Sequence, residues 1–402
     1  MKFDLVFEGG GAKGAAFVGA LEVFLHEHTY GRLMGASAGS IVATLLAAGY
    51  DLDEMREGLN EQGADGKHIF DSFMGTPPTF SRAEINSSAI RAFFRNLDIP
   101  FIPEFIEKSV DNWLTTTLAQ KPKYRHLFSL VERGGWYSAH NFTTWLAEKL
   151  DNRMVEGSVH NFSQMTLAEY FQATNVDLTL IAADSTDSRM LILNHKTAPD
   201  CPVVSAVRMS MSIPLIWPEI AWEAQWGRYR GRDITGHFVV DGGLISSFPL
   251  ELFVSDAPHV LALMGRKDSG SVIGLLIDEK LPVKNAPPPP EKDEGVLGLD
   301  VNELKTVQRI RRLAETAIQA HDNVIIEAFE DHVVRLPAKN YGLTEFNMST
   351  ERREALVAAG QQAMDNFLQR NVLESFEGSF DFSIDSKTVE KADRMAGRLL
   401  QE

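Results

Sequence analysis

The chain has 402 residues, of which 44% are hydrophobic and 23% charged, a composition typical of a globular protein that can bury a sizeable core. Its 55 Asp and Glu residues outnumber its 39 Lys and Arg residues by 16, which argues against nucleic acid as a partner because the phosphate backbone would be repelled. The same charge weakens docking to anionic lipid. We therefore expect any contact with a membrane surface to be transient and to depend on apolar surface or a local basic patch.

One cysteine, Cys201, is present, which excludes an intrachain disulfide and a cysteine-rich metal motif. The N-terminal run Met1–Gly10 is interrupted by Asp4 and Glu8, whereas a Sec-type signal peptide needs an uninterrupted apolar segment and a small-residue cleavage site. We expect a cytoplasmic or peripheral-membrane location, with secretion by a signal-independent route left open.

Two strand–turn–helix units are predicted at the N-terminus. Lys2–Phe7 is a short apolar run that ends at a glycine cluster, and apolar residues in Ala15–Glu27 then recur at helical spacing. Arg32–Met34 is predicted to be a second strand and Gly35–Gly39 a turn. The Ala- and Leu-rich segment Ser40–Ala48 then forms a helix that a glycine closes.

Residues 51–171 are mixed and mostly helical, with scattered aromatic side chains, and we interpret them as an insertion or helical cap over the site. Four β-rich runs follow, and they fit strands of one central sheet. These runs are Leu178–Ala183, Met190–His195, Phe238–Val240 and Val260–Met264.

The last third of the chain is predicted to complete the same layered core. The segment 280–297 contains Pro287–Pro290 flanked by charges, which suits a long surface loop. Helical periodicity in Leu299–Phe329, a strand at Val333–Leu336 and a helix at Glu351–Leu368 follow. The sequence thus predicts one α/β domain over residues 1–375, a three-layer α/β/α fold with a mostly parallel sheet, and a polar tail at 376–402.

The first motif is a glycine loop between the first strand and the first helix. Consecutive glycines expose amide groups, and the helix N-terminus adds positive potential, so the loop can hold an anion. It matches the Gly-x-Gly-x-x-Gly fingerprint of nucleotide-binding oxidoreductases. However, Leu33 and Met34 stand where an acidic residue is expected, and no Ser or Thr follows Lys13–Gly14 as a P-loop requires. The loop residues are Gly9, Gly10, Gly11, Ala12, Lys13 and Gly14.

The second motif is Gly-Ala-Ser-Ala-Gly at residues 35–39, a Gly-x-Ser-x-Gly pattern. A nucleophilic serine needs a tight strand-to-helix turn, and only small neighbours such as Gly35 and Gly39 let strand and helix approach there. The simpler alternative is that Ser37 caps the helix. In favour of a nucleophile, adjacent parallel strands would place the Gly10 and Gly11 amides beside Ser37 as oxyanion donors.

The third motif is a strand that ends in Asp241, Gly242 and Gly243. An Asp-Gly turn after a strand is common, yet Ser37 requires a base, and the two glycines permit close approach. A carboxylate of ordinary pKa, about 4, is a poor base, so Asp241 would have to be partly removed from water. Histidine is the usual base, but no recognisable spacing is found among His140, His160, His195 and His237.

In order and placement, the three motifs resemble the signature blocks of the patatin-like phospholipases, over most of residues 3–370. The resemblance implies a patatin-like fold and a Ser/Asp dyad in which Ser37 attacks the acyl carbonyl, Asp241 transfers the proton, and the Gly10 and Gly11 amides hold the oxyanion. It also implies calcium-independent hydrolysis of a phospholipid, lysophospholipid or other acyl lipid without a cofactor. Lys13 stands where the family has Arg or Lys. A lipid-binding module without turnover remains the alternative on this scaffold.

Two departures from the family pattern leave acyl-chain and head-group preference open. Met209 and Met211 stand where the family often has small residues, and Ser247 where it often has Asn. No metal-ligand spacing is found, so no metal is expected, and the oligomeric state is not predicted. Candidates for an apolar entrance are Phe93, Phe94, Phe101 and Phe105. A solvated helix face, or less favourably a head-group patch, is predicted at Arg309, Arg311 and Arg312.

Overall fold

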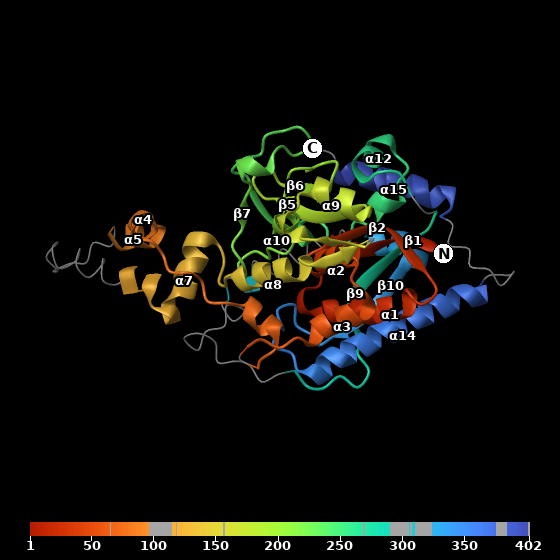
Figure 1. The fold of residues 1–402 in the computed structure, drawn as a ribbon, viewed down its shortest axis with the longest axis horizontal. Coiled ribbons are helices and arrows are strands. Elements are labelled where there is room, and N and C mark those ends of the chain that lie inside the picture. The colour runs from red at the N-terminus through yellow and green to blue at the C-terminus, as the bar shows by residue number, and fades with distance from the viewer. Residues whose placement is uncertain are drawn as a thin grey trace.

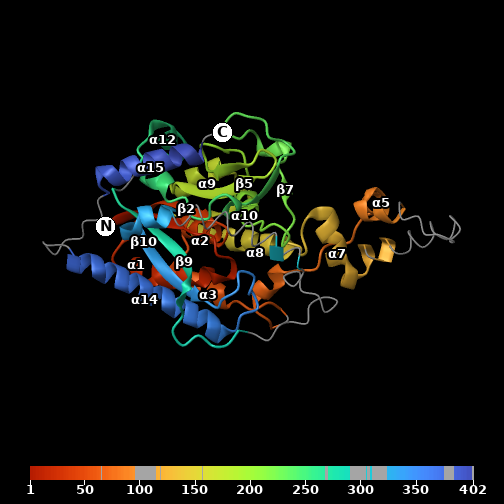
Figure 2. The same cartoon turned by 180° about the vertical axis from the view of Figure 1, so that it is seen from behind.

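An eight-stranded sheet forms the centre of the fold (Figures 1 and 2). The computed structural model describes residues 1–95, 115–289, 305, 308–309, 324–374 and 384–400, except positions 65, 118, 156, 268 and 269. The strand order is β10-β9-β1-β2-β5-β8-β7, with β6 paired to β5. Strands β10, β9, β1, β2 and β5 are parallel, whereas β6, β7 and β8 pair antiparallel, so the mostly parallel α/β sheet is confirmed. The strands are β1 (Lys2–Phe7), β2 (Thr29–Ala36), β5 (Leu178–Asp184), β6 (Arg189–Leu193), β7 (Ile220–Ala221), β8 (Phe238–Asp241), β9 (Val272–Pro282) and β10 (Val333–Lys339).

Helices cover both faces of the sheet, which gives the three layers. Side chains of β1 alternate between the two faces, because Leu5 and Phe7 pack in one core cluster and Val6 in the other. Among the described residues, no helix is both long and apolar enough to cross a bilayer. One face carries α1 (Ala15–Phe24), α2 (Ala38–Ala47) and α14 (Thr350–Glu374), and the opposite face carries α11 (Glu251–Val254), α12 (Pro258–Met264) and α15 (Ser386–Leu399).

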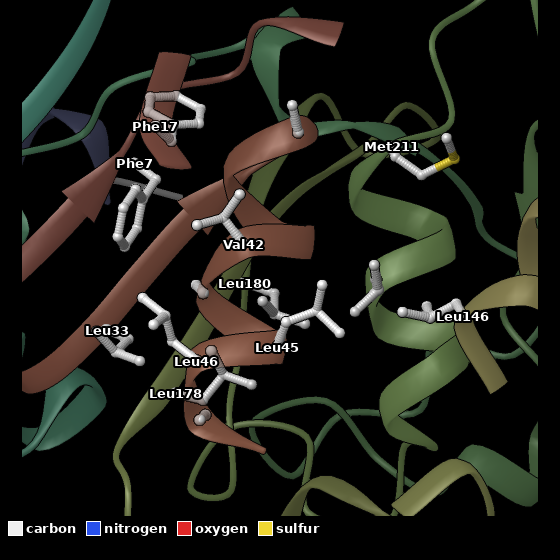
Figure 3. Packing of buried hydrophobic residues seen from close by; sticks show 14 of the residues in the cluster. Phe7, Phe17, Leu33, Val42, Leu45, Leu46, Leu146, Leu178, Leu180 and Met211 are labelled. Atoms are coloured by element: carbon white, nitrogen blue, oxygen red, sulfur yellow. The ribbon is translucent and has the colours of Figure 1, made fainter. Parts of the chain in front are cut away.

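Helix α2 is buried on nearly all sides. Figure 3 shows Val42 of α2 between Phe7 of β1 on one side and Met211 on the other. A helix that is apolar around its whole circumference is stable only inside a core, which explains its Ala- and Leu-rich sequence. Its N-terminus, where Ser37 lies, is therefore held by packing from several directions.

A buried ion pair joins β1 to β2. Asp4 accepts hydrogen bonds from the backbone amide and the Nε of Arg32, both at 2.8 Å. Arg32 Nη2 also donates to the Phe253 carbonyl of α11 at 3.1 Å. Both charged side chains are at most 1% exposed, and such burial is tolerated where further hydrogen bonds satisfy the pair. The pair fixes the two strands that lead into the glycine loop and into Ser37.

The described residues of the interval 51–171 form helices and one hairpin. Figures 1 and 2 show α4, α5 and α7 at one end of the long axis, whereas α3 and α8 lie against the body of the molecule. The helices from this point to β8 are α3 (Leu52–Asn60), α4 (Arg82–Ser87), α5 (Ala89–Arg95), α7 (Pro122–Arg133), α8 (His140–Leu150), α9 (Leu167–Thr174) and α10 (Val203–Ser210). The hairpin is β3 (Arg153–Val155) with β4 (Ser158–His160), and short 3-10 helices are η1 (Gly11–Gly14), η2 (Ile69–Phe73), η3 (Phe162–Gln164), η4 (Ala224–Trp226), η5 (Gly242–Leu244) and η8 (Glu330–His332).

The predicted strand at Val260–Met264 is wrong, because this segment belongs to helix α12. The helix begins at Pro258, a residue suited to the first helical turn, and buries Val260 and Met264 four positions apart on one face. Strand β9, which lies between β1 and β10, has no counterpart among the predicted strands.

Part of the predicted polar tail forms a helix that packs against α11. Helix α15 is amphipathic, with Ala392 and Ala396 fully buried beside α11. Asp393 Oδ1 accepts hydrogen bonds from Ser255 Oγ at 2.6 Å and from the Asp256 amide at 2.8 Å. Residues 386–399 therefore contribute to the core. Most of the predicted helical interval 299–329, and the Pro-rich segment from residue 290, lie outside the described residues.

Candidate active site

Ser37 occupies the turn between β2 and α2. Its backbone has φ 48° and ψ −120°, a conformation that residues other than glycine rarely adopt. Its amide donates to Ser210 Oγ at 3.1 Å, and its carbonyl accepts from the amide and the hydroxyl of Ser40 at 2.9 and 2.6 Å. The Ser37 side chain makes no capping hydrogen bond to α2, so the helix-cap alternative is not supported. A strained serine between strand and helix is the geometry of a nucleophile elbow.

Small residues bring the two N-terminal motifs together. A Cβ atom on Gly35 would lie 2.2 Å from the Gly39 carbonyl oxygen, so a side chain there would displace the backbone. A Cβ atom on Gly9 would lie 3.2 Å from the Ser37 Cβ, which places the glycine loop next to the serine. Parallel pairing of β1 with β2 aligns Phe7 with Gly35 and brings both turns to one sheet edge, as the sequence predicts.

The glycine loop leaves two amide groups without an acceptor. The amides of Gly9 and Ala12 donate to neighbouring backbone carbonyls at 3.2 and 2.9 Å, whereas Gly10 and Gly11 donate to no group in the described part of the chain. Gly11 has φ +54°, and a Cβ atom there would lie 2.1 Å from the Leu343 carbonyl oxygen. Both amides therefore remain available to a negatively charged oxygen.

Asp241 ends β8 at the same level of the sheet as Ser37. Strand β8 runs antiparallel to β5, so that Asp241 lies opposite Ala182. The preceding residue of β5, Ile181, lies opposite Ala36, the last residue of β2. One strand thus separates the carboxyl-bearing residue from the serine, and both stand at one edge of the sheet.

The Asp241 carboxyl is buried, since the residue is 5% exposed. Its Oδ1 accepts from the Gly243 amide at 2.8 Å, and its Oδ2 has no partner at standard hydrogen-bond distance and angle among the described residues. Burial raises the pKa of Asp241 from 3.8 to about 6, an effect that the nearby Ser37 hydroxyl and the Gly243 amide partly offset. A spare oxygen near the serine is what a base requires, and such contacts are often long before substrate binds.

Charged and polar side chains anchor the glycine loop to its surroundings. Lys13 is buried and forms an ion pair with Glu279 of β9. Glu8, at the end of β1, accepts from the Ile277 amide at 2.6 Å and from Ser247 Oγ at 3.3 Å. Lys13 and Ser247, two of the positions at which the sequence is compared with the family pattern, therefore hold the loop in place.

An apolar pocket with about 100 Å³ of free space opens beside Ser37. Its walls come from the glycine loop, α1, α2, α3, η2 and α8. Ala38, Ile41, Val42 and Leu45, which share one face of α2, line it, so the pocket runs along the helix away from Ser37. Charged side chains among its described lining residues are limited to Glu54, Lys149 and Arg353. A cavity of this character fits an extended apolar chain.

Several residues singled out from the sequence do not line this pocket. Phe93 is 63% exposed on α5, away from it, and Arg309 is exposed to solvent. The four histidines considered as bases, His140, His160, His195 and His237, do not line the pocket either. For Phe94 the side chain lies outside the described part of the structure. The other predicted positions, Phe101, Phe105, Arg311 and Arg312, lie entirely outside the described residues.

One group in the described part of the chain has the spacing of a cation site. Single ligand atoms of Asp184, Asp187 and His237 lie within 4.8 Å of one another. Asp184, however, already accepts hydrogen bonds from Arg189 Nε at 3.1 Å and from His237 Nδ1 at 2.9 Å. The arginine thus neutralises the buried carboxylate, and we assign the group a structural role.

Sequence reasoning missed two contributions to the site. Ser210 Oγ accepts a hydrogen bond from the Ser37 amide and donates one to the Ile181 carbonyl at 2.6 Å. In the sequence, only its position next to Met211 could have drawn attention to it. Phe346 and Met348 line the pocket from the C-terminal part of the chain, and no local pattern links them to Ser37.

Residues 5–254 match the family of the patatin-like phospholipases, and this interval contains all three motifs. The chain belongs to this family. In this patatin-like phospholipase the matched interval ends at α11, and β9, β10, α14 and α15 follow it.

Relatives of this patatin-like phospholipase occur in bacteria and viruses. The uncharacterized protein YqhO of Bacillus subtilis (strain 168) is 25% identical over 378 residues, which cover 92% of this chain and 99% of that protein. The probable lipid hydrolase 463L of Invertebrate iridescent virus 6 is 22% identical over 253 residues, 62% of each chain. Among solved structures, VipD from Legionella pneumophila aligns over 99% of this chain and 74% of its own, with 15% identity and a TM-score of 0.42.

Proposed function

We propose that this patatin-like phospholipase is a serine lipid acyl hydrolase that cleaves fatty acyl esters of phospholipids or lysophospholipids through Ser37 and Asp241. The observation that carries the proposal is a strained serine that faces an apolar pocket beside a buried carboxyl of raised pKa. The amides of Gly10 and Gly11, which donate to no acceptor in the described part of the chain, supply the donors that acyl transfer requires.

The proposed reaction has two halves. Ser37 Oγ forms a bond to the acyl carbonyl carbon while its proton moves to Asp241, and the Gly10 and Gly11 amides hold the resulting oxyanion. Collapse breaks the ester C–O bond, and Asp241 gives the proton to the leaving alcohol. Water then attacks the acyl-serine and loses a proton to Asp241, which returns it to Ser37 Oγ as the fatty acid leaves.

The pocket supports a fatty acyl substrate. Its lining is apolar over most of its length, and the burial of methylene groups is worth about 0.8 kcal/mol each. The name of the viral relative, probable lipid hydrolase, points to the same substrate class. The net charge of −16 favours brief contact with a lipid surface over stable docking to anionic membranes.

The oxidoreductase alternative gains no support from the glycine loop. A Cβ atom on Gly10 would lie 2.1 Å from Ile277 Cδ1, so this side of the loop packs against β9. At the end of β2, where an acidic residue would bind a ribose, the chain has Met34 and Gly35, both buried.

Active-site labelling tests the proposal. A fluorophosphonate reacts with an activated serine, so we expect one adduct on Ser37, located by mass spectrometry of the digested protein. Protein unfolded before labelling should take no adduct, because the strained turn and the buried carboxyl are then lost. Folded protein that binds lipid vesicles without any adduct would instead be the non-catalytic lipid-binding module.

The direction of the pocket predicts a change in acyl-chain preference. Leu45 lies eight residues after Ser37, about 12 Å along α2 at about 1.5 Å per residue. In Leu45→Trp, we expect kcat/KM for a palmitoyl nitrophenyl ester to fall about tenfold or more and that for a butyryl ester to stay within about twofold, because the indole fills only the distant part of the pocket. Leu127→Trp, on the outer surface of α7, serves as the control. Equal losses with both esters would contradict the assigned direction.

A further inference from the structure

Arg208 is a buried cation that the proposed reaction does not use. It lies on α10 and is 9% exposed. Its Nη1 donates to Ser212 Oγ and its Nη2 to the Pro218 carbonyl at 3.1 Å, and both acceptors are neutral. No carboxylate of the described residues forms an ion pair with it. Burial lowers the pKa of Arg208 to about 10, as expected for a charge without a counterion. Because an unpaired buried charge is costly, this guanidinium calls for an anionic partner.

Arg208 lines a second cavity, which has a volume of about 210 Å³. It shares no lining residue with the apolar pocket beside Ser37, which we call the acyl pocket. The cavity lies between α7, α8 and the segment that follows α10, with Pro77 and Pro78 on a further side. Figures 1 and 2 show α7 and α8 adjacent at the base of the projecting end. The cavity is thus far larger than the space that a single water molecule needs, and it can admit a phosphate group.

The lining of this cavity is electropositive. Arg133 and His140 accompany Arg208, and neither Asp nor Glu is found among the described lining residues, although the whole chain carries a net charge of −16. Arg133 is partly neutralised by Glu84 at 2.6 Å and stacks on Phe80, so Arg208 supplies the main uncompensated charge. Helix α8 also begins here, and its N-terminus adds positive potential, although the His140 amide donates to Ser138 Oγ at 3.2 Å.

Ser129 provides an independent observation. Ser129 of α7 is one of the lining residues of the cavity and is 1% exposed. Its hydroxyl has no hydrogen-bond partner among the described residues. A buried hydroxyl is normally bonded, so its free state here indicates a ligand that supplies the missing partner.

We propose that this cavity binds a phosphate-type oxyanion, with Arg208 as its charged contact and the Ser129 hydroxyl as an additional donor. Guanidinium groups bind such anions through paired N–H donors, which suits a group held in place by Ser212 and Pro218. The anion could be free phosphate or the phosphate of a lipid head group, which share this chemistry.

Occupancy of the cavity is coupled to the active site through one segment of chain. Ser212 Oγ donates to the Arg208 carbonyl at 2.6 Å, and the Ser212 carbonyl accepts the Asp241 amide at 3.0 Å. Met211 and Trp217 of the same segment line the acyl pocket. An anion on Arg208 would therefore stabilise the segment that carries one wall of the pocket and holds Asp241.

The test measures binding in Ser37→Ala protein, so that its outcome does not depend on the proposed hydrolase activity. Inorganic phosphate, glycerol 3-phosphate and glycerophosphocholine are titrated at constant ionic strength, with chloride as the reference, and followed by calorimetry and by the thermal unfolding midpoint. We expect saturable binding and a raised midpoint with at least one phosphate compound. Preference for inorganic phosphate identifies free phosphate as the ligand, and preference for glycerophosphocholine identifies a lipid head group.

In Ser37→Ala protein, the additional change Arg208→Gln should abolish phosphate binding. The additional change Ser129→Ala should weaken binding about threefold to tenfold, as expected for the loss of one hydrogen bond. Ser129→Ala removes no hydrogen bond to another described residue, so it remains informative if Arg208→Gln does not fold. The control is Arg228→Gln, which removes an exposed guanidinium that also donates to a neutral carbonyl. The proposal is overturned if phosphate acts no differently from chloride, or if Ser129→Ala binds as tightly as its parent, since the anion would then bind elsewhere.

Discussion

Replacing Ser37 by alanine should lower kcat/KM for acyl esters by about 10⁴-fold or more, the scale seen when a catalytic nucleophile or its base is removed. The methyl group cannot form the acyl-enzyme bond, and no other hydroxyl occupies the turn at the mouth of the acyl pocket. The fold should be unchanged, because the hydrogen bonds that hold this turn come from the backbone of Ser37. The measurement is hydrolysis of a short-chain nitrophenyl ester, followed by profiling of the products from phospholipid and lysophospholipid.

Ser88→Ala is a matched control for this experiment. Ser88 is 4% exposed, close to the 5% of Ser37, and bonds only within the α4–α5 region. We expect its activity to stay within about twofold of the parent protein. Circular dichroism and the thermal unfolding midpoint establish that both variants are folded. Full activity in folded Ser37→Ala protein would falsify the assignment of the nucleophile.

Asp241→Asn should be nearly as damaging, with a loss of about 10³-fold to 10⁴-fold in kcat/KM. The amide oxygen can still accept the Gly243 amide, as Oδ1 does at 2.8 Å, so the local backbone is preserved. The amide group, however, cannot accept the Ser37 proton. Activity close to that of the parent protein would show that another group serves as the base.

The raised pKa of Asp241 gives the active protein a defined pH dependence. Since the base must be ionised, log kcat/KM should rise with a slope of one below pH about 6 and level off above it. The residual kcat/KM of Asp241→Asn should not show this rise with pH. A parent profile that is flat from pH 5 to 8 at constant stability would contradict the role of Asp241 as base.

The same pKa has the opposite effect on stability. The folded-state pKa of about 6 exceeds the ordinary 3.8, so the folded protein binds this proton more tightly than the unfolded chain. Ionisation of Asp241 therefore costs stability progressively as the pH rises from 3.8 to about 6, and the full cost persists above that range. We expect Asp241→Asn to unfold at the same or a higher temperature than the parent protein at pH 8, and to lose this advantage at pH 4. Loss of activity with gain of stability would identify Asp241 as a functional residue whose burial opposes folding.

Sequence by itself determined the local geometry of the proposed nucleophile, Ser37. The strand Lys2–Phe7, the glycine loop and the turn at Gly35–Gly39 are contiguous patterns in which residue size and spacing dictate the backbone. Parallel pairing of the first two strands then follows from two successive strand–turn–helix units, and it brings Gly9 next to Ser37. These features depend on neighbours in the chain, so they can be predicted without coordinates.

Tertiary structure alone decided where the proposed base, Asp241, lies relative to Ser37 and what surrounds it. Strand β8 is antiparallel to β5, and only this pairing brings Asp241 to the level of Ser37. The same packing removes water from the Asp241 carboxyl and sets its pKa, and it recruits Phe346 to the pocket. Helix α12 illustrates the limit, because a short apolar run is compatible with a strand or a helix until its packing partners are known. Burial, strand direction and pocket walls arise from contacts between distant segments, and no local pattern encodes them.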